Sequence, residues 1–210
     1  MDVTVFGATG GIGRQIVRQA LAAGHHVTAV VRDPARLPVT GSGLEVVTAS
    51  LTDPEPLRAA VAGRDAVLSG LGPRRRKDAG IATEVTRPVL RAMEAEGVRR
   101  FVAVSAAPLG PVPQDETLLG RITAPVVSGL LRPVYDDLRA MEEEMRRSAT
   151  DWTAVRPPKL SDKPLTGVYR TALNANLRGG LTIGRADVAH AMLAVVDDAA
   201  TLKQAVGVAY

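Results

Sequence analysis

The stretch that decides the fold is Phe6-Gly7-Ala8-Thr9-Gly10-Gly11-Ile12-Gly13. Before it, residues 3–6 alternate in the manner of a buried strand, and after it apolar residues recur at helical spacing through residues 14–21. The glycines therefore stand at the joint between a strand and a helix. There, Gly7 allows the chain to turn, Gly10 leaves room for a pyrophosphate against the backbone, and Gly13 lets the helix pack closely on the sheet.

This turn has the properties of a phosphate-binding site. A helix that begins here presents unpaired N–H groups and the positive end of its dipole to an anion. The spacing is G-x-x-G-x-x-G, which differs from the G-x-G-x-x-G of many dehydrogenases. Glycines also occur simply as turn residues, but their place between a strand and a helix favours a dinucleotide site. We predict cofactor contacts from Gly7, Thr9, Gly10, Gly11, Ile12 and Gly13.

Strand-like and helix-like segments alternate along the rest of the chain. We expect strands at residues 3–6, 26–32, 44–48, 65–69, 100–104 and 152–155. We expect further helices at residues 53–61, 79–96 and 187–196, and Asp33-Pro34 has the form of a helix start. This alternation predicts an α/β fold of Rossmann type, a doubly wound parallel sheet of order 3-2-1-4-5-6, in one domain over residues 1–210.

Two segments interrupt the alternation. Residues 106–133 are rich in proline and glycine and are long for a plain connection, and residues 157–181 are irregular, with a short strand expected at 168–171. Both follow the carboxyl ends of predicted strands, where open α/β sheets bind their ligands. We therefore expect both segments on the substrate side of the domain.

The composition limits the classes of function. Hydrophobic residues make up 46% and charged residues 23%, no apolar run reaches a membrane span, and no basic-then-apolar leader is evident, so we expect a cytoplasmic protein without membrane contact. Cysteine is absent and there are three histidines, so we expect no metal. Aromatic residues at 3% offer few stacking platforms for nucleic acid. The net charge of +4 suits a phosphorylated cofactor or an acidic small molecule, bound by a monomer or small homo-oligomer.

The residues after the second strand favour NADP over NAD. Arg32 ends that strand and Arg36 follows four residues later, so both guanidinium groups can face one 2′-phosphate. Asp33 could instead hold ribose hydroxyls and repel the phosphate, but its position before Pro34 favours a helix cap. We therefore predict that NADPH binds in preference to NADH.

Other candidates follow the later strands. Leu71, Gly72 and Arg74 come after the fourth strand, where the chain should pass the middle of the cofactor. Ser105 ends the fifth strand beside the expected nicotinamide position, where its hydroxyl can bond a substrate carbonyl or cap the following turn. Lys159, after two prolines, would project toward the mouth of the site, with an ordinary exposed lysine as the equal alternative.

Tyr135 and Arg139 have the spacing of a Tyr-x-x-x-Lys acid pair, with arginine in place of lysine. In such a pair the cation lowers the pKa of the phenol. Acidic residues surround this one, however, so we expect Arg139 to bond a carboxylate of its own helix. Tyr135 is then a catalytic candidate beside the alternative of a packing residue.

These features together resemble a known group. The similar pieces are residues 6–10, 30–38, 61–67 and 154–169, of which the last, with its Pro-Pro and Asp-x-Pro-Leu-Thr-Gly, is the most selective. The chain resembles the atypical short-chain dehydrogenase/reductases, the NmrA-like NAD(P)H-binding proteins, and within them the biliverdin-IXβ reductase/flavin reductase group. The resemblance covers almost the whole chain and is weakest at residues 106–133.

The resemblance implies an NADPH-dependent reductase that passes hydride to a planar, conjugated acceptor such as a flavin, quinone or linear tetrapyrrole, and we expect this acceptor to be anionic. It places the pyrophosphate at Gly10 and Ile12 and the 2′-phosphate at Arg32 and Arg36. It also implies the remaining contacts, with Ser50 and Leu51 at the adenine, Leu71 and Gly72 at the ribose, and Pro158 and Leu160 at the nicotinamide.

The chain also departs from that group. Ser50 stands where the group has an acidic residue, Lys159 replaces its active-site histidine, and Ala106 replaces a serine. Our hypothesis is therefore that the catalytic residues orient an anionic acceptor. The candidates for this role are Lys159, Ser105 and Tyr135. The alternatives are a redox sensor that binds NAD(P) and a partner protein without turnover, and an isomerase or tailoring enzyme.

Overall fold

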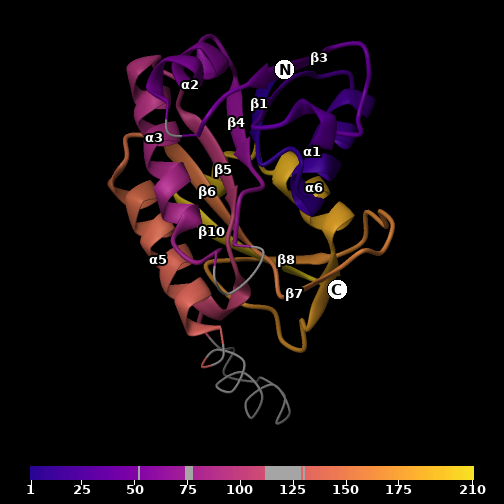
Figure 1. Ribbon diagram of the computed structural model, residues 1–210. Coiled ribbons are helices and arrows are strands. Elements are labelled where there is room, and N and C mark those ends of the chain that lie inside the picture. The colour runs from indigo at the N-terminus through magenta and orange to yellow at the C-terminus, as the bar shows by residue number, and fades with distance from the viewer. Residues whose placement is uncertain (52, 74–77, 112–128, 130) are drawn as a thin grey trace.

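Eight strands form one sheet in the computed structural model, in the order β3-β2-β1-β4-β5-β6-β10-β8 (Figure 1). The structure describes residues 1–51, 53–73, 78–111, 129 and 131–210. The strands of this sheet are β1 (Asp2–Phe6), β2 (His26–Val31), β3 (Leu44–Thr48), β4 (Ala66–Ser69), β5 (Arg100–Val104), β6 (Asp151–Arg156), β8 (Arg170–Leu173) and β10 (Gln204–Ala209). A separate two-stranded sheet pairs β7 (Lys159–Ser161) with β9 (Thr182–Gly184).

The helices alternate with the strands as the sequence predicts. They are α1 (Gly11–Ala22), α2 (Pro54–Val61), α3 (Ile81–Ala95), α5 (Arg132–Arg147) and α6 (Arg185–Ala194). Short 3₁₀ turns lie at η1 (Pro34–Arg36), η3 (Ala107–Leu109) and η4 (Ala199–Thr201). Within the described ranges, no helix has the combination of length and apolar character that a bilayer crossing requires.

The predicted parallel order 3-2-1-4-5-6 is confirmed, and two further strands extend it. The pairing of β1 with both β2 and β4 is parallel, so the strand order reverses at β1. β10 adds in parallel to β6, and β8 closes that edge in the antiparallel direction. The sequence prediction lacked β10, and its short strand at 168–171 overlaps β8 at Arg170 and Thr171 only. Asp33-Pro34 starts a 3₁₀ turn instead of a longer helix.

Helices cover both faces of the sheet and bury two apolar cores (Figure 1). On one face α1 and α6 pack together over β1, with Ile16, Val188 and Met192 fully buried. On the other face α2, α3 and α5 pack side by side, with Met93 and Met141 buried between them and the sheet. Each such side chain contributes about 1.5–3 kcal/mol on burial, so the two layers hold the carboxyl edge of the sheet in a fixed shape.

One contact fixes α5 against the start of α3. The carboxylate of Asp137, on α5, accepts hydrogen bonds from the backbone N–H groups of Ala82 and Thr83, each at 3.0 Å, and from the Thr83 hydroxyl at 2.8 Å. The residue before α3, Gly80, is the N-cap and has no side chain of its own to offer. Asp137 therefore caps a helix that is distant in sequence, and is itself buried.

We predict that Asp137→Ala lowers the free energy of unfolding by about 2 kcal/mol, because it leaves two N–H groups of α3 without their acceptor. Urea unfolding followed by circular dichroism measures the change. The matched control is Asp136→Ala, whose exposed carboxylate pairs with Arg139 and Arg132 of the same helix, and which we expect to cost less than about 0.5 kcal/mol. Equal losses in the two variants would contradict the capping role.

Candidate functional site

The glycine turn forms a tight joint between β1 and α1. Gly7 has a φ of +73°, a conformation that favours glycine, and its carbonyl accepts a 2.8 Å hydrogen bond from the Gly10 N–H. A Cβ on Gly7 would lie 2.9 Å from the backbone of Gly70 and Leu71, which follow β4. The turn therefore has no room for a side chain at its first glycine.

Gly13 and Gly70 complete this joint. A Cβ on Gly13 would lie 2.1 Å from the Gly7 carbonyl oxygen, and a Cβ on Gly70 would lie 2.8 Å from the Gly13 nitrogen. The backbones of β1, β4 and α1 therefore meet without side chains between them, which is the close helix–sheet packing expected of Gly13. Gly70 was not singled out by the sequence reasoning, although its place in Ser69-Gly70-Leu71-Gly72, directly after a strand, was an available signal.

The start of α1 is suited to bind a pyrophosphate. Its N-cap, Gly10, provides no side-chain hydrogen bond, and the first turn of the helix holds no acidic residue. The first N–H groups of a helix lack acceptors within the helix and carry its positive dipole end. These residues fit the phosphates of NAD(P), because a glycine cradle leaves the backbone donors accessible and no carboxylate opposes the anion.

Arg32 and Arg36 lie exposed just beyond the end of β2. Arg32 follows the last residue of the strand, and Arg36 ends η1. Asp33 between them is the N-cap of η1, since its Oδ1 accepts a 3.1 Å hydrogen bond from the Ala35 N–H. The capping alternative for Asp33 is therefore the one seen, and its carboxylate is engaged with the backbone.

The other predicted cofactor residues lie along the same carboxyl edge. Leu51 and Leu71, after β3 and β4, pack against the core beneath α2 and α3, and Ser50 beside Leu51 is exposed. A Cβ on Gly72 would meet nothing within 4 Å, so the space in front of it is open. Pro158 is half-buried, and Leu160 on β7 packs on the core beneath α1 and α6. Arg74 lies outside the described residues.

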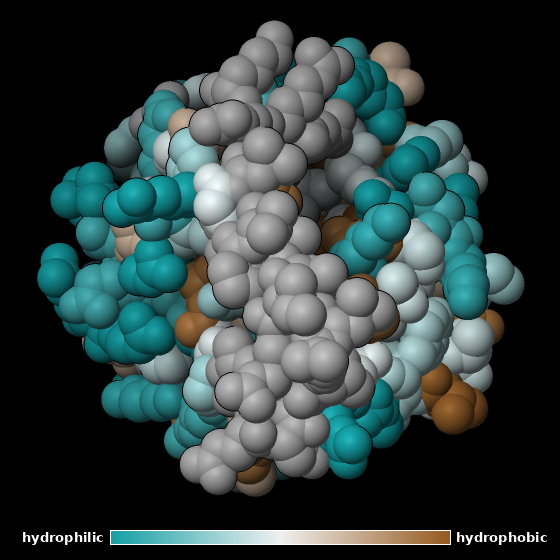
Figure 2. All heavy atoms as spheres, turned by 90° about the horizontal axis from the view of Figure 1, so that it is seen from below, coloured by the Kyte–Doolittle hydropathy of each residue, from teal (hydrophilic) through white to brown (hydrophobic). Residues whose placement is uncertain are grey.

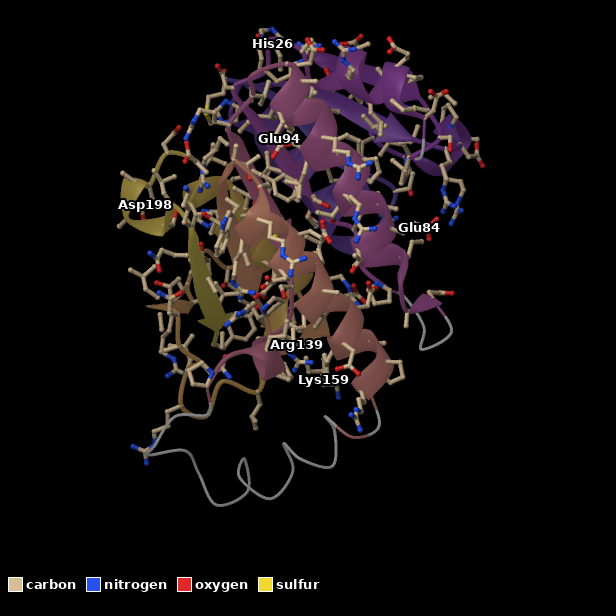
Figure 3. The ribbon with its side chains drawn as sticks, turned by 90° about the vertical axis from the view of Figure 1, so that its left-hand side faces the viewer. His26, Glu84, Glu94, Arg139, Lys159 and Asp198 are labelled. Carbon is tan, nitrogen blue, oxygen red and sulfur yellow. The ribbon has the colours of Figure 1, made fainter. Side chains whose placement is uncertain are left out.

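Figure 3 separates the two ends of the molecule. His26, at the start of β2, and Glu94, near the end of α3, lie at the end opposite Lys159 and Arg139. Lys159 is exposed at the start of β7, just after the carboxyl end of β6. Figure 2 views this end from below, where hydrophilic residues form much of the outer surface and hydrophobic residues appear in patches between them.

A buried charged network supports the ends of β5 and β6. Glu142, on α5, is 1% exposed, and its Oε1 accepts hydrogen bonds from the Ser105 hydroxyl at 2.7 Å and from Arg156 Nε at 2.9 Å. Its Oε2 accepts from Arg156 Nη2 and, at 2.8 Å, from Arg146 Nη2. Burial acts to raise the pKa of the Glu142 carboxyl, but the hydrogen bonds from Arg156 and Ser105 outweigh it, so the net pKa is lowered.

The sequence reasoning missed this network. Glu142 shares the buried face of α5 with Leu138, Met141 and Met145, and an acidic residue at apolar helical spacing was the available signal. For Ser105 the consequence is that its hydroxyl proton is donated to Glu142 in this structure. A role of Ser105 toward a substrate therefore stays a prediction, in which the hydroxyl oxygen would accept a hydrogen bond.

Tyr135 and Arg139 do not form an acid pair in this structure. Tyr135 packs against the core beneath α3 and α5, and burial raises the pKa of its phenol, opposite to the lowering that a neighbouring cation gives. Arg139 Nη1 bonds Asp136 Oδ1 at 2.7 Å, so the arginine pairs within its own helix as expected. Among the described residues, no three histidine, aspartate or glutamate side chains gather as a metal site.

A recess of about 650 Å³ lies at the opposite, amino ends of the strands, with Gly63, Asp65 and Arg99 in its wall. Its buried cation, Arg100, donates to the carbonyl oxygens of residues 151, 195 and 196 and to the Thr201 hydroxyl. The guanidinium is thus occupied in joining β5 to the end of α6. The candidate site remains the carboxyl edge, where the glycine turn lies.

We predict that Glu142→Gln lowers the free energy of unfolding by about 3 kcal/mol at neutral pH, because it leaves Arg156 buried without its counter-charge. The control is Glu143→Gln, a half-exposed neighbour paired with Arg146 and Arg147, which should cost less than about 0.5 kcal/mol. Urea unfolding measures both.

The same pair of variants gives a pH dependence. Because the folded pKa of Glu142 is depressed, its stabilisation is complete above the ordinary glutamate pKa of about 4.3 and is lost as pH falls through the folded pKa. The stability difference between wild type and Glu142→Gln should therefore be constant from pH 7 to about 5 and shrink in more acidic solution. A difference that grows on acidification would contradict the charged network.

Comparison with known proteins agrees with this geometry. The NAD(P)H-binding family matches residues 7–199. A 3-diazoavenalumate denitrifying reductase of a Streptomyces species is 38% identical over 141 residues, which is 60% of this chain and 45% of that protein. A (4-alkanoyl-5-oxo-2,5-dihydrofuran-3-yl)methyl phosphate reductase of Streptomyces griseus is 31% identical over 159 residues, 74% of this chain and 46% of that protein. The chain thus spans about half the length of these relatives.

The fold is shared more widely. The solved structure of ChuY, an anaerobillin reductase from Escherichia coli O157:H7, superimposes with a TM-score of 0.81 at 21% sequence identity, covering 100% of this chain and 97% of that one. At this identity the likeness concerns the fold. The family match spans nearly the whole chain and includes the glycine turn, and so the chain belongs to the NAD(P)H-binding family.

Proposed function

We propose that this protein is an NADPH-dependent reductase that delivers hydride to a planar, conjugated and anionic acceptor such as a flavin, quinone or tetrapyrrole. The observation that carries the proposal is the uncapped start of α1 at the carboxyl edge of the sheet, with two exposed arginines beyond β2. The reductase names of the two Streptomyces relatives and of ChuY support the reaction class.

The residues of this chain divide the binding of the cofactor between them. The N–H groups at the start of α1, including that of Ile12, would bind the pyrophosphate, and Arg32 and Arg36 would bind the 2′-phosphate. Asp33 does not compete for that position, because its carboxylate caps η1. Pro158 and Leu160 would pack beside the nicotinamide and exclude water there.

When bound, NADPH supplies the hydride, which is two electrons and one proton. The chain needs no strong acid for this reaction if the second proton reaches the acceptor from solvent. What it must provide is orientation, since holding two reactants in contact is itself a large part of catalysis. Lys159, exposed at the start of β7 just after β6, would attract an anionic acceptor and stabilise charge that develops on it.

We predict that NADPH binds at least about tenfold more tightly than NADH, which corresponds to 1.4 kcal/mol, because two guanidinium groups can bond the 2′-phosphate. Replacing Arg32 and Arg36 together by Ala should erase this preference and leave the affinity for NADH unchanged, so NADH is the internal control. Isothermal titration calorimetry measures both. Equal affinities in the wild-type protein would contradict the NADP assignment.

We predict NADPH oxidation, followed by absorbance, with at least one acceptor from a panel of flavins, quinones and linear tetrapyrroles.

Lys159→Ala should reduce kcat/KM for anionic acceptors by about 5- to 50-fold, or 1–2.3 kcal/mol, through loss of charge attraction. Lys163→Ala, an exposed lysine four residues later, is the matched control and should have wild-type activity. Cofactor binding without turnover of any acceptor would instead favour a redox sensor.

A further inference from the structure

The side chain of Arg185 lies across the glycine turn. Arg185 is the first residue of α6, and a Cβ built on Gly11 would lie 2.6 Å from its Cδ, 2.9 Å from its Nε and 3.9 Å from its Cζ. Gly11 is the first residue of α1. The end of the Arg185 side chain therefore lies against the start of α1, where a pyrophosphate would bind, and it occupies the space that a side chain on Gly11 would fill.

The fold explains this position. α1 and α6 pack along each other, as Figure 1 shows, and Gln19 Nε2 donates a 2.9 Å hydrogen bond to the Ala186 carbonyl. The start of α6 is thereby held beside α1. In the small sheet, Ser161 of β7 pairs with Gly184 of β9, so the residues that follow each strand are neighbours. These are Asp162 and Arg185, whose Oδ1 and Nη1 are 2.7 Å apart.

The charges around the turn leave this guanidinium available to an anion. Asp187, in the first turn of α6, accepts hydrogen bonds from Thr166 and Gly167 N–H groups and from the Tyr210 hydroxyl, so α6 has its own carboxylate. α1 has none. The carboxylate of Asp162 is 90% exposed and the side chain of Arg185 31% exposed. Such a solvent-screened pair is weak, and a doubly charged pyrophosphate can take its place.

We propose that Arg185 is a cofactor-binding residue that donates hydrogen bonds to the pyrophosphate of NAD(P)H. This inference rests on the proposed cofactor site and adds to the helix N–H groups a full positive charge from α6. The planar fork of arginine matches phosphate oxygens and gives stronger bonds than neutral donors. The local sequence around Arg185 does not predict this role, because Gly11 and Arg185 come into contact only in the folded chain.

The test is the affinity for NADPH and for NADH, measured by calorimetry on the full chain. Arg185→Ala should weaken the binding of both by about tenfold or more, because both carry the pyrophosphate. Replacing Arg32 and Arg36 should weaken only NADPH, so the two phosphate sites are distinguished by the pattern. Arg185→Lys should recover part of the loss, since it keeps the charge and loses the fork. The matched control is Arg18→Ala, an exposed arginine farther along α1, with wild-type affinity expected.

A purely structural role for Arg185 makes different predictions. If the arginine served only to hold the loop through Asp162, then Asp162→Ala would weaken the cofactor as much as Arg185→Ala does, whereas we expect a change of less than about twofold. Direct phosphate contact also requires that the dependence of affinity on salt concentration become shallower in Arg185→Ala, because one cation no longer meets the anion.

The outcomes separate the two proposals. Wild-type protein that binds neither dinucleotide overturns the cofactor site and this inference together. Wild-type protein that binds them while Arg185→Ala binds equally well, with an unchanged salt dependence, overturns this inference alone. An equal loss in Asp162→Ala and Arg185→Ala also overturns it, and assigns the arginine to the support of the loop.

Discussion

The contact of three backbones at Gly7, Gly13 and Gly70 is the constraint on which the rest of the site depends. A Cβ on any of the three would come within 3 Å of a backbone atom of its neighbours, so α1 could not approach the ends of β1 and β4 as closely as it does. α6 packs on α1 and would be displaced with it. The absence of these three Cβ atoms therefore sets where the dipole of α1 points, how open the space in front of α1 is, and where α6 lies beside it.

The fold could be predicted from the sequence because its signals are local. Apolar runs, helical periodicity and the glycine turn fix the order of the first six strands, and the structure confirms that order. β10 was missed for a tertiary reason. Its run Gln204–Ala209 contains Gly207, where a Cβ would lie 2.3 Å from the Ala175 carbonyl oxygen. A glycine that weakens the strand pattern in the sequence is thus what lets another segment cross over the strand in the structure.

The candidate site likewise has features that the sequence could predict and features that it could not. The position of the two arginines just beyond β2 and the capping role of Asp33 could be deduced, because each depends on neighbours within a few residues. The bond between Ser105 and Glu142 joins residues from β5 and α5, and the contact of Arg185 with Gly11 joins the two ends of the chain. No periodicity or motif predicts such pairs, since they arise from helix packing. The pattern could indicate only that Glu142 faces the core; it could not identify Arg156 as the partner that makes a buried carboxylate tolerable.

The β7–β9 pair has a consequence for how the two ligands are related. Lys159 begins β7, and Arg185 directly follows β9, while backbone pairing holds the two strands in register from Lys159–Thr182 to Ser161–Gly184. The same unit is fastened to the main sheet where the Tyr210 N–H bonds the Thr182 carbonyl. Lys159, the side chain proposed to face an acceptor, thus begins this three-residue ladder, and Arg185, the side chain proposed to bind the pyrophosphate, directly follows it. Substitutions at Lys159 and at Arg185 should therefore not act independently. The sum of their separate effects on binding free energy would be a poor estimate of the effect of the double substitution.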